Sequence, residues 1–468
     1  MRYAVLIVCV ASCVACSVAP RYRSPDVRIP ASFKEAPGWR EAKPSDAVAR
    51  GEWWQLFDDP VLGDLQRQVV LSNQTLATSK AAYDQARALV RELRASLLPV
   101  ISLTASGTKV GSFGPGTPTV GNVGTVNTGG TSRYSITIGT TWEPDLWGRI
   151  GDSVRQAGAL AEASAADLAN ATLSAQGELA LDYVQLRGLQ AQEQVLNATI
   201  AAYERALAIT TNRYNAGVAA RSDVLQAETA LRNARANVAD LVRQRALLEH
   251  AIAVLVGVNP SSFTLPRGEW SRNVPDIPGV LPASLLERRP DIAAAERRVA
   301  AANSAIGIER SAYFPTLQLS GDAGYSSRTT SDLFESASSV WSLGLTGALT
   351  LLDFGARSAR VDEARAAYEQ TVAEYRQAVL LAFQQTEDQL AALRVLAIVS
   401  TERNAAAVAA NQAEQIANNQ YVAGQISYAD VIVAQTAALS ARQAEIQAVV
   451  DRQSAAVSLI QAIGGQWQ

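Results

Sequence analysis

The period of the hydrophobic pattern changes several times along the chain, and each change predicts an element. In residues 61–97 apolar side chains recur every three or four positions, which is typical of a helix, and Pro99 follows. Apolar and small polar residues then alternate over about 100–110 and again over about 133–142, which predicts two strands. Residues 111–131 are rich in Gly, Thr and Asn and are expected to form the loop between these strands.

The same order of elements returns in the second half of the chain. A predicted helix from residue 290 precedes alternating runs over about 316–325 and 340–350. After each pair of strands comes a long stretch without proline, at 152–213 and at 358–420. Each stretch predicts a helix of some 60 residues, which would be a rod of about 90 Å.

This order reflects an internal duplication. Three pairs of residues lie 207 positions apart: Tyr214 and Tyr421, Gly217 and Gly424, and Asp223 and Asp430. We therefore expect the following organisation: a signal peptide at 1–15, an N-terminal tether or collar segment at 16–60, a first repeat at 61–258 with its tip turn at 214–223, a proline-rich connector or equatorial collar at 259–289, and a second repeat at 290–468 with its tip turn at 421–430.

The predicted strands have the length of tilted membrane-spanning strands, with one apolar and one small polar face. A soluble hairpin packed on a helix is the alternative, but neither face offers large residues for a core. Four strands cannot close a barrel, and lipid does not tolerate an open sheet edge. The predicted fold class is therefore an α+β membrane protein, in which three chains share a twelve-stranded β-barrel that continues into a long α-helical coiled coil.

The N-terminus carries the pattern of a secretory signal. A positive start and a short apolar run lead to Cys13 and Cys16, and a Cys after small residues suggests a lipoprotein signal whose Cys is acylated. Either Cys fits the pattern, and a cleaved signal without lipid is the alternative. No later window is apolar enough to predict a transmembrane helix.

Composition argues against an enzyme and against a nucleic-acid partner. The net charge is −3 without a basic patch, so nucleic acid has no electrostatic attraction to the chain. All three Cys lie in the first 16 residues, and His250 is the only His. The mature chain therefore has no ligand set for zinc, an iron–sulfur cluster or copper, and we expect no cofactor. A catalytic triad would depend on His250, which we expect to be packed on a helix.

Several motifs together carry a family resemblance: Cys16-Ser17 with Pro20 and Tyr22, Trp53-Trp54 with Asp59-Pro60, Trp142-Glu143-Pro144-Asp145-Leu146-Trp147-Gly148-Arg149, Arg289-Pro290-Asp291-Ile292, Ile306-Gly307 and Tyr313-Phe314-Pro315. In their order and spacing, over essentially the whole mature chain, the sequence resembles the TolC-type outer-membrane efflux proteins. It is most similar to the lipoprotein branch that serves resistance–nodulation–division pumps.

The resemblance implies a homotrimer with an outer-membrane barrel and a periplasmic helical tunnel. The implied function is that of the exit duct of a tripartite pump, which passes drugs or other small toxic compounds outward. Its implied partners are a periplasmic adaptor, an inner-membrane transporter and outer-membrane lipid. The family spacing also selects Cys16 as the lipid anchor. A duct for type I protein secretion or for metal-cation efflux would use the same fold, and a periplasmic lipoprotein enzyme remains a third class.

The resemblance also assigns roles to the tip turns, with Gly217 and Gly424 as turn glycines. In the family the end of the tunnel farthest from the barrel is closed at rest, and acidic residues ring its narrowest point. The residues expected at this periplasmic gate are Asp430, Tyr421, Asn419, Asp223 and Tyr214. Helix capping is the alternative role of Asp430 and the favoured role of Asp223. Some members have an Arg where this chain has Ile426, so a gate latched by that Arg is not expected here.

The remaining motifs have mainly structural interpretations. Trp142 and Trp341 lie near strand ends and are expected at the membrane interface, whereas Trp147 could equally pack at the strand–helix corner. Asp145 and Asp353 are predicted to cap helices. The Arg289-Pro290-Asp291 motif predicts a helix start, and Trp53-Trp54 is expected in a collar around the helices.

Overall fold

A computed structural model of the chain describes residues 17–30, 32–35, 52–111, 131–268, 270–275, 277 and 289–465. The chain divides into two compact units, and both take segments from the two sequence repeats. One comprises residues 1–25, 84–163 and 296–373, and the other comprises residues 26–83, 164–295 and 374–468. We describe each unit by itself.

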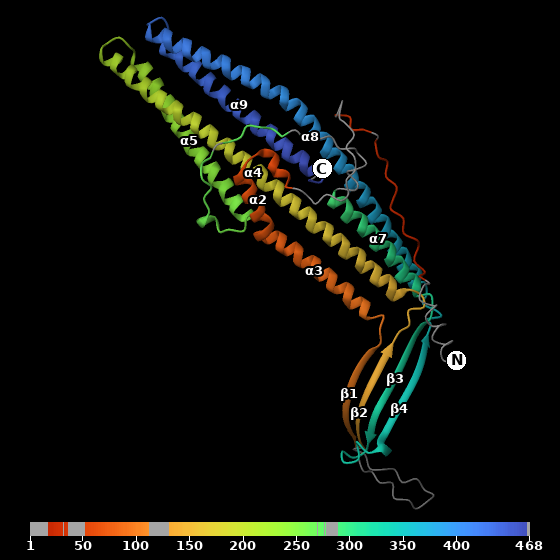
Figure 1. Cartoon of the computed structure of the whole chain (residues 1–468). Coiled ribbons are helices and arrows are strands. Elements are labelled where there is room, and N and C mark those ends of the chain that lie inside the picture. Colours follow the sequence, from red (N-terminus) through yellow and green to blue (C-terminus); the bar gives the residue numbers. More distant parts are fainter. Residues whose placement is uncertain are drawn as a thin grey trace, which may run out of the picture. The chain divides into compact units, whose positions relative to one another are not determined.

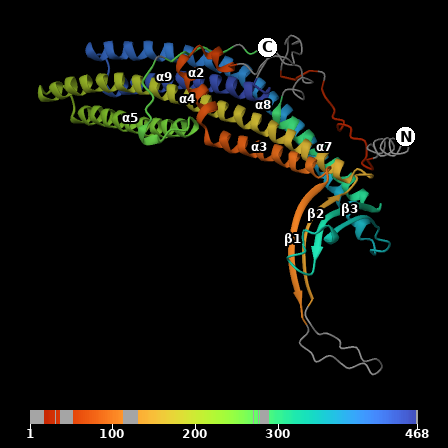
Figure 2. The same ribbon diagram turned by 60° about the horizontal axis from the view of Figure 1, so that its bottom comes forward.

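The first unit contains an antiparallel sheet that the described residues build from two hairpins in the order β1-β2-β3-β4 (Figure 1). The strands are β1 (Val100–Val110), β2 (Thr131–Trp142), β3 (Thr316–Ser327) and β4 (Ser339–Ala348). The pairing of β2 with β3, which places Ile138 opposite Ala323, joins the hairpin of one repeat to that of the other. The curved sheet is visible from a second direction in Figure 2. The period of two in the sequence therefore predicts these strands correctly.

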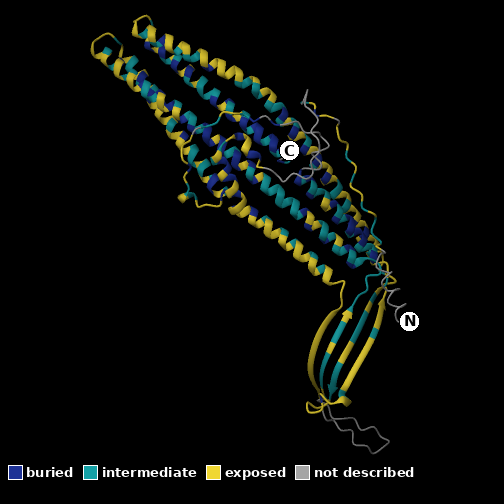
Figure 3. Cartoon of the chain, viewed as in Figure 1, coloured by how far each residue is buried: buried dark blue, intermediate teal, exposed yellow. Residues whose placement is uncertain are grey.

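Much of this sheet is exposed to solvent in the single chain (Figure 3). Leu103 on β1 is 71% exposed, and Trp341 on β4 is 81% exposed. β1 and β4 are the two edges, and within the described part of the chain neither has a strand on its outer side. The predicted loop at 111–131 falls almost wholly outside the described residues. Between β3 and β4 lies a short 3₁₀ helix, η3 (Ser336–Ser338).

The helices follow the duplication closely. They are α2 (Pro60–Ser72), α3 (Gln74–Ala95), α4 (Arg149–Asn215), α5 (Arg221–Leu255), α7 (Pro290–Ser311), α8 (Ala356–Val422) and α9 (Tyr428–Ala462). The two long helices, α4 and α8, have 67 residues each, and the returning helices, α5 and α9, have 35 residues each. At 1.5 Å per residue, each long helix is a rod of about 100 Å. None of the described helices combines the length and apolar character that crossing a bilayer requires.

One helix prediction was wrong in detail. The pattern of residues 61–97 predicts a single helix, whereas the structure breaks it at Asn73 between α2 and α3. The backbone of Asn73 is extended, and its side chain accepts a hydrogen bond from the Leu76 amide at 3.0 Å. Its amide group also donates to the Leu255 carbonyl at 2.8 Å. Asn73 therefore caps a new helix while it binds α5, and periodicity does not report such a contact.

The main core of the second unit lies where the short helices pack on the long ones. Trp53 and Trp54 of the 3₁₀ helix η1 (Trp53–Phe57) are buried there, with ring centroids 5.9 Å apart in an edge-to-face arrangement. Leu62 from α2 and Leu459 from α9 belong to the same cluster. Beyond α5, the described part of the connector holds a short 3₁₀ helix, η2 (Pro260–Ser262). The collar role of these segments stays a prediction.

Candidate functional site

The two tip turns lie in the second unit, where they join α4 to α5 and α8 to α9. Both long helices end at a glycine with positive φ, 76° at Gly217 and 72° at Gly424. In the first turn the Val218 amide donates to the Arg213 carbonyl at 2.9 Å, and the equivalent bond in the second turn has the same length. These are the bonds of a Schellman motif, which favours glycine because other residues resist positive φ. The repeated Tyr-x-x-Gly pattern therefore encodes the ends of both long helices.

Asp430 forms half of a capping box at the start of α9. The Ser427 hydroxyl accepts a hydrogen bond from the Asp430 amide at 3.4 Å. In return, the Asp430 carboxylate accepts from the Ser427 amide at 3.1 Å and from its hydroxyl at 2.6 Å. Both backbone N–H groups are thereby satisfied at a helix end that would otherwise leave them unpaired. Asp430 is exposed at the tip, so it caps the helix and still faces solvent.

Asp223 occupies the equivalent position in the first turn, but it does not cap its helix. The N-cap residue there is Ala220, which has no side-chain acceptor, and no side-chain cap hydrogen bond forms. Within the described part of the chain, the one hydrogen bond to the Asp223 carboxylate comes from the Ser222 hydroxyl, at 3.4 Å. The prediction that Asp223 is a cap was therefore wrong. The N-cap position, three residues earlier, holds Ala220, which has no side-chain oxygen to complete a capping box. Tyr214, in the same turn, is 42% exposed.

The other predicted gate residues do not contact Asp430 within one chain. The Tyr421 ring lies 5.3 Å from the Tyr428 ring, and the Arg213 guanidinium lies 4.8 Å from the centroid of Tyr421. Asn419 is exposed, and its carbonyl accepts from the Ala423 amide at 3.0 Å. Pairing of Tyr421 or Asn419 with a neighbouring chain stays a prediction.

The aromatic cluster packs the two tip turns against each other. Arg213 is the last basic residue of α4, yet it reaches the end of α8 and donates to the Tyr421 carbonyl at 3.5 Å. Tyr428 is buried, and burial together with the charges that Tyr421 and Tyr203 would carry raises its pKa to about 12. Ile426 packs on the same cluster, so this position of the turn makes an apolar contact.

The tryptophans near the strands have partners in the first unit. The Trp142 indole donates to the Leu97 carbonyl at 2.9 Å, and Trp341 is exposed on β4. An interfacial role for both stays a prediction. Trp147 stacks on Phe314 with ring centroids 4.6 Å apart, and its indole donates to the Pro315 carbonyl at 2.8 Å. Trp147 therefore packs at the strand–helix corner.

Both aspartates predicted as caps make capping contacts. The Asp145 carboxylate accepts from the amides of Ile150 and Gly151, at 3.1 and 2.6 Å, in the first turn of α4. Asp353 accepts from the Arg357 amide at 3.1 Å and from its guanidinium at 2.7 Å. The two strand–helix corners of the duplicated unit are thus built alike.

Arg289 does more than precede a helix. It is 7% exposed, and α7 begins at the next residue. Its guanidinium donates to the Asp291 carboxylate at 3.0 and 2.6 Å, to the Ala462 carbonyl at 2.8 Å and to Gln385 at 2.9 Å. Arg289 therefore ties the start of α7 to α8 and to the last turn of α9. The sequence motif predicts the helix start but gives no signal for these distant partners.

His250 is exposed on α5, so the expectation that it is packed was wrong. Within the described residues, no group of three or more His, Cys, Asp or Glu side chains could hold a metal ion. Cys13 and Cys16 lie outside the described residues, so acylation stays a prediction.

Comparisons with known proteins agree with this architecture. The family model described as outer membrane efflux protein matches the chain twice, at residues 65–258 and 281–465. The outer membrane protein OprJ of Pseudomonas aeruginosa is 30% identical, over 97% of this chain and 93% of its own length. The toluene efflux pump outer membrane protein TtgC of Pseudomonas putida is 29% identical, with the same coverage.

Solved structures show the same fold. The outer-membrane channel OprN has a TM-score of 0.87 and 30% identity, over 97% of this chain and 100% of that one. The outer-membrane channel MtrE of Neisseria gonorrhoeae, in its open state, has a TM-score of 0.84 and 26% identity, over 96% and 98% of the two chains. From its two family matches, its four-stranded sheet and its paired long helices, the chain belongs to the outer membrane efflux protein family and is an outer-membrane efflux channel protein.

Proposed function

We propose that three copies of this chain form the exit duct of a tripartite efflux pump. The observation that carries the proposal is the sheet with two open edges and exposed apolar side chains on both edge strands. Lipid cannot satisfy unpaired backbone groups at such edges, so each edge needs a strand from another copy. Twelve strands from three copies close a barrel wide enough for a channel, whereas eight strands would be filled by side chains.

The partners follow from the kind of pump. An outer-membrane duct has no energy source of its own, so the proposed complex includes an inner-membrane resistance–nodulation–division transporter and a periplasmic adaptor. Most of these relatives are named as outer membrane proteins of efflux pumps, and three are named for toluene. We propose drugs or other small toxic compounds as the exported class.

The experiment that tests the assembly is a mass measurement in mild detergent combined with conductance in planar bilayers. A trimer that conducts supports the duct. A monomer or dimer that retains channel activity would refute the shared barrel. Deletion of the gene together with complementation in a drug-sensitive strain tests export, and unchanged drug accumulation would refute the proposed substrate class.

We also propose that Cys16 is acylated after the signal peptide is cleaved. The proposal is supported by the Cys-Ser-Pro-Tyr spacing of the family. Each buried methylene contributes about 0.8 kcal/mol, so several acyl chains would anchor the terminus firmly. Intact-mass analysis tests this proposal, and an unmodified mature terminus would contradict it.

The proposed gate lies at the tip turns. Asp430 is exposed at its turn, and threefold symmetry would bring three such carboxylates near one axis, where they would repel each other and attract cations. Asp430→Ala should therefore weaken cation selectivity and divalent-ion block. Ser427→Ala is the matched control, because it removes the same capping box without removing a carboxylate. If both variants change conductance equally, Asp430 acts only as a cap.

A further inference from the structure

The segment immediately after Cys16 lies along α7 in an ordered arrangement. We call residues 17–22 the strap. Within the first unit, the strap is held by hydrogen bonds to three residues of α7 that lie seven positions apart. Arg310 donates to the Val18 carbonyl at 3.5 Å, and Asn303 donates to the Pro20 carbonyl at 2.9 Å. The Tyr22 hydroxyl donates to the Glu296 carboxylate. Burial, and then the hydrogen bond to Glu296, raise the pKa of Tyr22, so its proton stays available for this bond.

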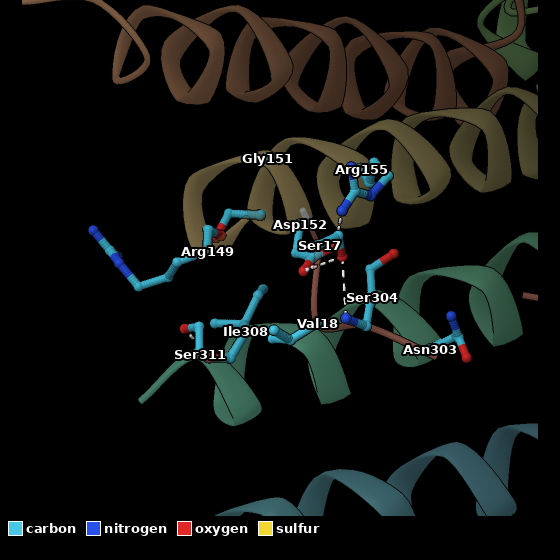
Figure 4. Close-up of polar contacts among 12 residues, drawn as sticks. Ser17, Val18, Arg149, Gly151, Asp152, Arg155, Asn303, Ser304, Ile308 and Ser311 are labelled. Atoms are coloured by element: carbon cyan, nitrogen blue, oxygen red, sulfur yellow. Dashed lines mark hydrogen bonds and ion pairs between the residues drawn. The ribbon is translucent and has the colours of Figure 1, made fainter. Parts of the chain in front are cut away.

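The first strap residue contacts a buried carboxylate. Asp152, in the first turn of α4, is fully buried, and the Ser17 hydroxyl lies 3.1 and 3.0 Å from its two oxygens (Figure 4). The same hydroxyl accepts from the Ala19 amide at 3.1 Å. Arg155, about half exposed, forms an ion pair with Oδ1 of this carboxylate. The Ser17 hydroxyl therefore donates to Asp152 and accepts from the backbone of the strap itself.

Gly307 on α7 leaves the space in which the strap and α4 come into contact with this helix. A Cβ atom at this position would lie 2.4 Å from an Asp152 oxygen and 2.5 Å from the Ala19 Cβ, and both distances are far below van der Waals contact. The backbone φ of Gly307 is not positive, so glycine is required here for space rather than for conformation. Only a glycine at position 307 therefore leaves room for Ala19 of the strap and Asp152 of α4 to approach α7 this closely.

We propose that Asp152 is a dock for the N-terminal strap and that it selects a hydroxyl side chain at position 17. An alanine at position 17 would leave the buried carboxylate with only its half-exposed Arg155 partner. A carboxylate there would repel Asp152, because two like charges cannot share such a site. The contact begins at Ser17, so it does not depend on acylation of Cys16, and it is independent of the proposed pump function.

Trypsin provides a reporter without any added label. Arg21 lies inside the strap between two contacts, whereas the exposed Arg28 lies beyond it and serves as an internal reference. A protease needs several residues of free chain, so cleavage after Arg21 requires release of the strap. We would measure the ratio of cleavage at Arg21 to cleavage at Arg28 by mass spectrometry, on the full-length protein in detergent.

Ser17→Ala and Asp152→Ala should each raise this ratio about tenfold or more, because a hydrogen bond to a charged group is worth at least that factor in an opening equilibrium. Ser17→Thr, which keeps the hydroxyl, should stay near the wild-type ratio. The double variant should cleave no faster than Asp152→Ala alone, because the two residues act through one contact. Gly307→Ala should also release the strap.

Asp240→Ala is the matched control, because Asp240 pairs with Arg243 at the same i,i+3 spacing but is exposed and belongs to the second unit. A wild-type ratio in Ser17→Ala would overturn the proposal. Equal effects from Asp240→Ala, or additive effects in the double variant, would overturn it as well.

Discussion

Among single residues, Ala220 and Ser427 decide how the two returning helices begin. They occupy equivalent positions in the repeats, and three positions later each is followed by an aspartate. With Ser427 the aspartate completes a capping box, whereas with Ala220 it does not. The first tip turn therefore has an N3 carboxylate whose capping partner is missing.

We predict that Ala220→Ser strengthens the first tip turn. The new hydroxyl can accept from the Asp223 amide, and N-cap serines stabilise a helix by about 1 kcal/mol relative to alanine. Hydrogen exchange of the amides in residues 221–224 should slow about fivefold, the factor that corresponds to this free energy. Ser427→Ala should speed exchange at residues 428–431 by a similar factor. Unchanged exchange in Ala220→Ser would show that the turn backbone cannot form the box.

Asp182 on α4 is a second residue whose environment has a measurable consequence. Burial, and then repulsion from Glu178, raise its pKa to about 6. In the unfolded chain its pKa is near 4, so the folded state binds more protons between pH 4 and 6. Stability therefore falls as pH rises through this window, and the full penalty is present above pH 6.

Asp182→Asn should accordingly raise the thermal unfolding temperature at pH 7.5 and have little effect at pH 3.5. The gain should shrink steadily as the pH is lowered from 6 to 4. Asp240→Asn is the control, because the pKa of Asp240 is lowered by its hydrogen bonds to Gln244 and Arg243. A pH-independent gain in Asp182→Asn would mean that the effect comes from packing rather than from charge.

At the scale of elements, contacts between helix ends decide how the rods are fastened. Arg289 is the clearest case, because one guanidinium reaches the start of α7, the side of α8 and the last turn of α9. Removing it leaves the Ala462 carbonyl and the Asp291 carboxylate without this donor. Breaking a buried charge pair by removing one partner costs about 3–5 kcal/mol.

Arg289→Ala should therefore unfold the end of α9 locally, with much faster hydrogen exchange at residues 459–463. Arg289→Lys should be nearly as harmful, since an ammonium group cannot make the two parallel bonds to Asp291. Arg272→Ala removes an ion pair with Glu445 in which the Arg272 side chain is 50% exposed. This substitution should change hydrogen exchange little. Equal exchange in the Arg289 and Arg272 variants would contradict this role.

The elements themselves could largely be predicted from the sequence, because periods of two and of three to four residues report which faces are apolar. The same pattern could not reveal the break at Asn73, where side-chain hydrogen bonds rather than apolar spacing end the helix. Nor could it reveal the strap or the bonds of Arg289 to α8 and α9. Those contacts join residues more than 90 positions apart, and polar side chains at such distances leave no periodic trace.

At the scale of the whole molecule, the open sheet edges make a prediction about neighbouring copies. Cysteine at Ala105 on β1, combined in turn with cysteine at each position from 341 to 346 on β4, should give disulfide-linked dimers and trimers in at least one register. Neighbouring antiparallel strands bring such pairs to about 4.5–5.5 Å. Single-cysteine variants should remain unlinked.

The matched control for this experiment is a cysteine pair at Ala105 and Ile136, which lie opposite each other within one chain. This pair should oxidise without forming dimers or trimers. If it oxidises while every β1–β4 combination stays monomeric, the edges are not joined between copies. The proposed assembly follows from the number of strands and from their unpaired edges. The residues of the tip turns that face the threefold axis cannot be predicted from one chain, because their positions depend on neighbouring copies.

The equal lengths of the paired rods limit how this protein can change during evolution. α4 and α8 have 67 residues each, so both tip turns end their rods after the same number of helical turns. Inserting one residue into either rod would lengthen it by about 1.5 Å and rotate everything beyond it by about 100°. We expect homologues to gain or lose length in steps of about seven or eleven residues, which restore the facing side chains. Such steps should occur in both rods together, because Arg213 and Tyr421 can meet only if the two hairpins remain level.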